Sequence, residues 1–321
     1  MTDPNRVDTL VVGAGPAGLS AALNLARARM RVLVVDSNRP RNAATMISHG
    51  FLTRDGIPPH ELRRIAREEL GAYPEAEIVQ RSSVVGIRRI DQTGAATDAD
   101  SHPFLATVRG GTQAGDRLVL ARTVLVATGL RETLPALPSI RAFYGMSLFS
   151  CVACDGYEQS DRPLALIGET PDLLARALLV SRWSSDLTVF TNGLAELEAG
   201  DEEHLAHRGI RVERRAIDDL EGERGSVTAV RLVDGERVPI DGGFVRPLWH
   251  PVVDALAELN PACDDDGHLV TDRDGRTSLP GVYAAGDVAA PGPQQLIVAA
   301  GAGARVASVI TQDLLGVSTS H

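Results

Sequence analysis

The chain has 321 residues, of which 44% are hydrophobic, and its net charge is −10. This length exceeds that of a usual single domain, so we expect two domains. The acidic balance disfavours nucleic acid and anionic membranes as partners, and no apolar run approaches the ~20 residues of a membrane span. The N-terminus lacks the basic segment of a signal peptide, which favours a cytoplasmic location.

The first 36 residues predict a βαβ unit. Residues 7–12 are typical of an apolar strand, "GAGPAGLSAALNLARARM" has helical periodicity, and "RVLVVD" is a second strand. The turn after the first strand has the pattern Gly13-x-Gly15-x-x-Gly18. Gly13 permits a tight turn, Gly15 lets the backbone approach a pyrophosphate, and Gly18 lets the helix pack closely on the strand.

This unit predicts a dinucleotide site. The helix that begins near Pro16 and Ala17 offers free N–H groups and a positive dipole end to phosphates. Asp36 ends the second strand, 23 residues after Gly13, at a position where an acid can bind a ribose hydroxyl.

The rest of the chain also predicts an α/β fold. An amphipathic helix at 60–71 precedes three strands, "AEIVQRSSVVGIRRI", "PFLATVRG" and "RLVLARTVLVATG", which indicate a β-meander that returns to a parallel sheet. A second α/β pattern runs from about 130 to 243, with the strands "PLALIG" and "DLTVF" on either side of a helix at 172–183. The late segment "GVYAAGDV" is followed by a Gly/Ala-rich helix.

Two of the three cysteines, Cys151 and Cys154, form a CxxC motif in "CVACDG". Zinc would need two more soft ligands, and Cys263 stands alone, so no metal site is expected. Two residues between cysteines at the start of a helix allow a disulfide to close, and the helix dipole lowers a thiol pKa. From the motif alone, Cys151 and Cys154 can be either a redox pair or an inert buried pair.

Together these pieces resemble the low-molecular-weight thioredoxin reductase family of FAD flavoproteins. The resemblance covers nearly the whole chain: the N-terminal GxGxxG, the strand ending in "ATG", "CVACDG", and "GVYAAGDV" with its helix. It implies two Rossmann-like, three-layer ββα domains. A discontinuous FAD-binding domain would comprise residues 1–129 and 244–321, and residues 130–243 would form a central domain that carries the CxxC. A homodimer is a further expectation of the family.

The resemblance also implies which residues bind the cofactor. In the family the aspartate of "AAGD" binds the ribityl chain of the flavin, and the residues after it begin a helix that points at the isoalloxazine. The cofactor-binding residues expected here are Gly13, Gly15, Pro16, Ala17, Gly18, Asp36, Thr128, Gly129, Gly286, Asp287, Gln295 and Leu296.

The same resemblance assigns roles around the cysteines. Cys154 would face the flavin and Cys151 would exchange with the substrate. Asp155 matches the family's acid, which moves a proton to or from a leaving thiolate; the alternative is a carboxylate at a helix N-terminus with no catalytic part.

His250 is the candidate for the base that generates an attacking thiolate. His250 in "FVRPLWHP" falls where the chain would re-enter the FAD-binding domain, and Trp249 could line a dithiol pocket beside it. His250 could equally be a junction residue with no catalytic part, and His49 in "SHGF" is open to the same two interpretations. Tyr157 and Trp183 are expected in the core.

The family's second dinucleotide motif, GxGxxA for NADPH, is degenerate in "LALIGETPDLLARA". Gly168 is present, but Thr170 replaces the second glycine and Leu173 replaces the small residue. Asp172, near the helix N-terminus, would repel a pyrophosphate. The next strand, "LTVFTNGLAELEAG", lacks the basic residues that hold a 2′-phosphate. The sequence therefore disfavours NADPH use.

A flavin and a disulfide without a nicotinamide site need another redox partner. The chain resembles the flavin-dependent dithiol oxidases of the gliotoxin and holomycin type, which oxidise a small-molecule dithiol and pass electrons through FAD to O2. Residues 38–56 and "GYE" at 156–158 fit that subgroup; Val152 and Asp155 depart from its proline and histidine. The alternatives are a thioredoxin-disulfide reductase driven by NADPH or another donor such as ferredoxin, and a flavoprotein redox sensor without turnover.

Overall fold

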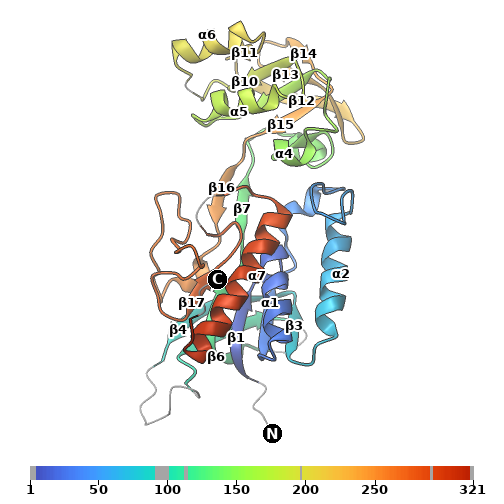
Figure 1. Ribbon diagram of the computed structural model, residues 1–321. Coiled ribbons are helices and arrows are strands. Elements are labelled where there is room, and N and C mark those ends of the chain that lie inside the picture. The colour runs from blue at the N-terminus through green and yellow to red at the C-terminus, as the bar shows by residue number, and fades with distance from the viewer. Residues whose placement is uncertain (1–4, 91–100, 112–114, 196, 290–291, 319–321) are drawn as a thin grey trace.

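The computed structural model describes residues 5–90, 101–111, 115–195, 197–289 and 292–318. These residues form two α/β bodies, one above the other (Figure 1). The lower body contains both ends of the described chain, and the upper body contains its middle. Two strands connect the bodies, β7 (Leu130–Thr133) and β16 (Leu248–Pro251), and they pair with each other in antiparallel register.

The lower body is built on a seven-stranded sheet in the order β3-β2-β1-β6-β5-β4, with β17 beside β6. Strand β2 (Val32–Asp36) is buried throughout, and β1 (Arg6–Val12) is buried in its C-terminal half, as expected for parallel strands that are covered on both faces. The other strands are β3 (Ala76–Gln80), β4 (Ser82–Arg89), β5 (Phe104–Gly110), β6 (Arg117–Val126) and β17 (Val282–Ala284).

Three helices cover one face of this sheet (Figure 1): α1 (Pro16–Arg27), α2 (Pro59–Gly71) and the long α7 (Leu296–Leu315). The antiparallel meander β4-β5-β6 packs over the opposite face, where Ile87 shares a core with Leu33 and Val35 of β2. Helices, parallel sheet and meander are the three layers expected from the sequence.

One expected strand is divided in two. Arg81 has a left-handed backbone with φ of 54°, which ends the ladder between β3 and β2 and starts a separate strand, β4. As a result β3 extends the parallel sheet while β4 begins the meander.

The upper body has a five-stranded parallel sheet in the order β11-β10-β9-β15-β8. Its strands are β8 (Leu148–Phe149), β9 (Leu164–Ile167), β10 (Leu187–Phe190), β11 (Arg211–Glu213) and β15 (Gly242–Val245). Helices α5 (Leu173–Val180) and α6 (Ala199–His207) and a three-stranded sheet of β12 (Ile217–Glu223), β13 (Ser226–Leu232) and β14 (Arg237–Pro239) pack against it. The sequence did not predict α6, β12 or β14.

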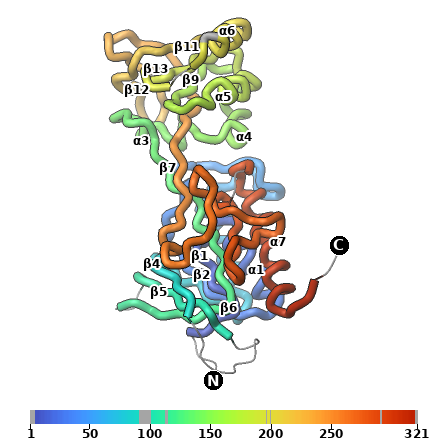
Figure 2. Tube along the Cα trace, turned by 90° about the vertical axis from the view of Figure 1, so that its left-hand side faces the viewer, coloured from blue at the N-terminus to red at the C-terminus, as the bar shows by residue number. Residues whose placement is uncertain are grey.

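The boundary expected between residues 243 and 244 falls inside β15, which pairs with β8 and β9 of the upper sheet. The chain leaves the upper body only after this strand, through β16. We therefore place the division at the β7–β16 pair, which Figure 2 shows as the narrow connection between the bodies. Among the described residues, no helix combines the length and apolarity that crossing a membrane requires.

Candidate active site

A cavity between the two bodies brings together most of the expected site. From the lower body it is lined by the turn after β1, the end of β2, the end of β6 and the start of α7; from the upper body by Cys151, Cys154 and Asp155. Of the expected cofactor residues, those in the lining are Gly13, Gly15, Pro16, Ala17, Asp36, Thr128, Gly129, Gly286, Asp287, Gln295 and Leu296. Gly18 lies outside the lining.

The glycine turn after β1 has the close approaches expected from its spacing. Gly13 has φ of +105°, and a Cβ atom there would lie 2.4 Å from the carbonyl oxygen of Ala127. A Cβ atom at Gly18 would lie 2.0 Å from the oxygen of Gly13. Gly18 therefore lets α1 pack closely on the turn and does not itself line the cavity. A Cβ at Gly15 would meet nothing within 4 Å. The backbone at Gly15 is thus open to a ligand, and the turn fits a dinucleotide phosphate.

Asp36 is held in place at the end of β2. Its Oδ1 accepts a hydrogen bond from the backbone N–H of Asn38 at 2.8 Å, and its Oδ2 pairs with the guanidinium of Arg67 in α2. The carboxylate lies in the cavity lining, at the edge where a ribose would be expected.

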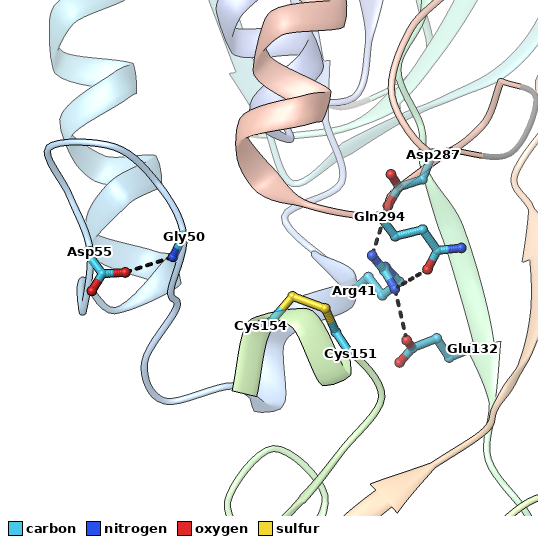
Figure 3. The surroundings of a disulfide bond; sticks show 8 residues. All are labelled: Arg41, Gly50, Asp55, Glu132, Cys151, Cys154, Asp287 and Gln294. Carbon is cyan, nitrogen blue, oxygen red and sulfur yellow. Dashed lines mark hydrogen bonds and ion pairs between the residues drawn. A yellow bond between two sulfur atoms is a disulfide. The ribbon is translucent and has the colours of Figure 1, made fainter. Parts of the chain in front are cut away.

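Arg41 is a further member of the cavity that the sequence does not predict. It lies in the short helix η1 (Arg41–Ala44). Its Nη2 donates to Oδ2 of Asp287 at 2.8 Å, and its Nη1 donates to Glu132 at 3.2 Å and to Gln294 at 3.1 Å (Figure 3). Burial raises the pKa of Asp287, and the guanidinium of Arg41 opposes that rise.

The two cysteines of the CxxC motif form a disulfide, with 5.3 Å between their Cα atoms. Cys151 precedes α4 (Val152–Asp155) and Cys154 lies within it; both are half-buried and face the cavity. Because α4 has only four residues, its dipole is weaker than that of the helix predicted from the sequence. Figure 3 shows the disulfide beside Arg41.

Asp155 follows Cys154 directly and is 9% exposed. Burial raises the pKa of its carboxyl to about 7, against the opposing effect of His49, and Glu158 raises it further. A carboxyl with this pKa can both donate and accept a proton near neutral pH.

The imidazole that lines the cavity belongs to His49 rather than His250. His49 Nε2 lies 3.5 Å from Oε1 of Glu158, and its Nδ1 lies 3.6 Å from Oδ1 of Asp55. His250 is exposed on β16, where its Nε2 lies 3.2 Å from Oγ1 of Thr133, and it is not among the lining residues.

Two aromatic residues near the disulfide also depart from expectation. Tyr157 is 82% exposed, so the expectation that it lies in the core is wrong. Trp183 is partly buried against the backbone of Gly156.

Comparison with known proteins decides the family. The family model for pyridine nucleotide-disulphide oxidoreductases matches residues 7–303. The chain belongs to this family.

Relatives of this oxidoreductase include proteins named as thioredoxin reductases. Thioredoxin reductase tcpT of Claviceps purpurea is 31% identical over 298 residues, which cover 89% of this chain and 88% of tcpT. The crystal structure of HlmI aligns with a TM-score of 0.88 and 36% identity, over 98% of this chain and 95% of HlmI. A structure described as thioredoxin reductase TrxB from Bacillus anthracis aligns with a TM-score of 0.86 and 38% identity, over 97% and 99% of the two chains.

These matches confirm the resemblance to low-molecular-weight thioredoxin reductases and the doubly Rossmann-like α/β fold. Members of this family bind FAD, and FAD is the cofactor of this oxidoreductase. The open backbone at Gly15 and the lining acids fit such a dinucleotide.

At the start of α5 the structure describes the turn in which the sequence disfavours NADPH. A Cβ atom at Gly168 would lie 2.6 Å from Cδ2 of Leu173 and 2.9 Å from Cβ of Arg246, so side chains fill the space at this turn. Arg176 and Arg246 are cations that the sequence argument overlooked. Both pair with Asp172, at 2.7 Å and 3.0 Å.

The Asp172 carboxylate is ionised in this cluster. Burial alone would raise its pKa, but hydrogen bonds from Thr170 and Arg176 hold the pKa below its usual range. The guanidinium of Arg246 also lies over the ring of Trp249, 4.1 Å from its centroid. Trp249 thus packs against this cluster and is not among the residues that line the cavity.

Proposed function

We propose that this oxidoreductase oxidises a small-molecule dithiol to a disulfide through Cys151 and Cys154, and that FAD then passes the electrons to O2. The observation that carries the proposal is the shared cavity. The disulfide and the Asp155 carboxyl lie in the same lining as the glycine turn that fits a dinucleotide phosphate. Bound FAD supplies a two-electron acceptor to this site.

In this proposal the chain's own groups bind the cofactor as follows. The backbone at Gly13–Ala17 would hold the pyrophosphate, and Asp36 would hold a ribose. Asp287 would hold the ribityl chain, and the other lining residues that would hold the cofactor are Thr128, Gly129, Gly286, Gln295 and Leu296. Arg41 neutralises Asp287 and fixes its orientation through their 2.8 Å contact.

The proposed exchange proceeds in two displacements. A substrate thiolate attacks Sγ of Cys151, the bond between Cys151 and Cys154 breaks, and the leaving thiolate of Cys154 takes a proton from Asp155. The second substrate thiol then attacks the mixed disulfide and releases Cys151. The substrate loses two electrons and two protons, and the cysteine pair gains them.

Two observations support a small dithiol as the electron donor. The ion pairs of Asp172 with Arg176 and Arg246 disfavour NADPH at the second dinucleotide position. The partly exposed apolar side chain of Ile47 lines the same cavity as the disulfide and offers surface to the carbon skeleton of a small substrate.

A second candidate is a disulfide reductase for a thioredoxin-like protein. Asp155 favours it, because the thioredoxin reductases that the sequence resembles have an acid at this position and the dithiol oxidases have a histidine. The name thioredoxin reductase on several relatives also favours it.

The test is oxidation of dithiothreitol by the purified holoenzyme in air without nucleotide, followed by the absorbance of the cyclic disulfide product. Activity is expected in the wild type and in Cys263→Ser, which removes the exposed free cysteine. Cys151→Ser and Cys154→Ser should both be inactive. Absence of dithiothreitol oxidation, together with NADPH-driven reduction of a thioredoxin disulfide, would favour the second candidate.

A further inference from the structure

We propose that His49 is the catalytic base that takes the proton from the incoming substrate thiol at the Cys151–Cys154 disulfide. This assignment rests on the dithiol exchange proposed above and adds to it the group that generates the attacking thiolate.

The loop that carries His49 is held in a defined shape. Ser48 pairs with Ile57 as an isolated β-bridge, and the Ser48 hydroxyl donates to the Ile57 carbonyl at 2.6 Å. The backbone N–H of Gly50 donates to Oδ1 of Asp55 at 2.7 Å, a bond that Figure 3 shows in the loop next to the disulfide. The loop joins η1 to α2 in the lower body, so it brings an imidazole to a disulfide of the upper body.

Carboxylates flank the imidazole on both sides. Nδ1 faces Asp55 of the same loop at 3.6 Å, and Nε2 faces Glu158, four residues after Cys154, at 3.5 Å. Both distances exceed those of a closed hydrogen bond. As a base the ring must be neutral, and with its proton on Nδ1, on the side of Asp55, the Nε2 lone pair is free to accept a proton from a substrate thiol. The side chain of His49 is 22% exposed, so the ring is accessible from the cavity.

The exchange needs two proton-transfer groups at once. One must accept the proton of the incoming thiol, and the other must give a proton to the leaving cysteine thiolate. Burial keeps the Asp155 carboxyl protonated up to a pH of about 7, which suits the donor. A carboxyl that donates cannot accept in the same step, so the acceptor is a separate group. A neutral imidazole has a ring nitrogen that can accept this proton, and His49 supplies one in the cavity lining.

The proton balance closes with these two groups. The S–H bond of the substrate breaks and its proton goes to Nε2 of His49, while the new S–S bond forms to Cys151. The bond from Cys151 to Cys154 breaks, and Asp155 protonates Cys154. In the second displacement the remaining substrate thiol gives its proton to the Asp155 carboxylate, and the proton held by His49 goes to the released Cys151.

The test is anaerobic reduction of the Cys151–Cys154 disulfide by dithiothreitol in the holoenzyme between pH 6 and 10. Samples are quenched with acid and labelled with a maleimide, and mass spectrometry counts two labels beyond the one on Cys263. At pH 7, His49→Gln is expected to react ~10²-fold more slowly than the wild type. Above the ordinary thiol pKa of about 8.5 the substrate ionises without a base, so the two rates should converge.

His250→Gln is the matched control, because it removes an imidazole that lies outside the cavity lining. It should react like the wild type at every pH. Equal rates for His49→Gln and the wild type at pH 7, or a loss for His49→Gln that is the same at every pH, would overturn the base assignment alone. A wild-type disulfide that dithiothreitol does not reduce would overturn the proposed function, and this assignment with it.

Discussion

Nε of Arg246 lies 3.0 Å from Oδ2 of Asp172 at the start of α5. The same carboxylate binds Arg176 in α5 at 2.7 Å. An internal acid thus neutralises both cations of this turn, at the position where other members of the family would bind a nucleotide pyrophosphate. The pyrophosphate of a nucleotide would have to displace the Asp172 carboxylate from Arg176 and Arg246, and it would still lie close to that negative charge.

The first prediction is that NADPH does not reduce the flavin at a useful rate. Anaerobic mixing of the holoenzyme with NADPH should leave the visible flavin absorbance unchanged over minutes, whereas dithiothreitol should bleach it. The physical reason is the Asp172 carboxylate, which is ion-paired with Arg176 and Arg246 at the start of α5. Rapid bleaching by NADPH would show that this turn binds the nucleotide in spite of the acid.

The second prediction separates cofactor binding from folding within the glycine turn. Gly15→Ala should fold with the thermal stability of the wild-type apoprotein, because its Cβ meets nothing within 4 Å. The same methyl group occupies the position that a phosphate would approach, so FAD affinity should fall about tenfold or more. The measurement is titration of the apoprotein with FAD, followed by the change in flavin fluorescence.

Gly13→Ala is the matched comparison in the same turn. Its Cβ would lie 2.4 Å from the Ala127 oxygen at a φ of +105°, so the apoprotein itself should lose stability. Equal FAD affinity in Gly15→Ala and the wild type would remove this turn from the cofactor site.

The third prediction concerns the pH dependence of Asp155→Asn. The carboxyl is the proton donor only while protonated, and its pKa is about 7 because it is buried. The ratio of wild-type to variant rates of disulfide reduction should therefore be ~10² below pH 6 and fall toward one above pH 8. A ratio that does not change between pH 6 and 9 would contradict the donor role.

The raised pKa of Asp155 also predicts how the stability of the folded protein changes with pH. Because the folded pKa is raised from 3.8 to about 7, the wild type loses stability as the pH rises through this window, by at most about 4 kcal/mol. Asp155→Asn lacks this titration. Its unfolding temperature relative to the wild type should thus be higher at pH 8 than at pH 5, and the opposite order would contradict the raised pKa.

The fourth prediction assigns the two halves of the disulfide. If Cys154 is the thiol that contacts the flavin, Cys151→Ser should leave a thiolate against the oxidised cofactor and show a long-wavelength absorbance band. Cys154→Ser should show no such band, yet Cys151 should still form a mixed disulfide with a substrate thiol. The band in the opposite variant would exchange the two roles.

The parts of the fold that the sequence predicts are those fixed by local pattern. The spacing of Gly13, Gly15 and Gly18 between two strands predicts the βαβ unit, because the glycines permit the tight turn at Gly13, the open backbone at Gly15 and the close packing of α1 at Gly18. The split at Arg81 and the true end of β15 depend on which strands pair across the sheet. No local pattern carries that information.

The candidate site divides in the same way. The expected cofactor positions and the CxxC come together at the cavity because motifs identify them. Arg41 contacts Glu132, Gln294 and Asp287, which lie 91, 253 and 246 residues away in sequence, so its role follows only from the fold. The sequence favoured His250 as the catalytic histidine, and only packing shows that His49 lines the cavity while His250 is exposed on β16.

The central claim is that a dithiol delivers electrons to O2 through the Cys151–Cys154 pair. The most direct measurement follows O2 consumption and hydrogen peroxide release by the holoenzyme in air, with dithiothreitol as the sole reductant. The account predicts one O2 consumed and one hydrogen peroxide formed for each dithiol oxidised, with no nucleotide present and no turnover in Cys154→Ser. Dithiol oxidation that continues at the same rate in Cys154→Ser, or flavin turnover that requires NADPH, would contradict it.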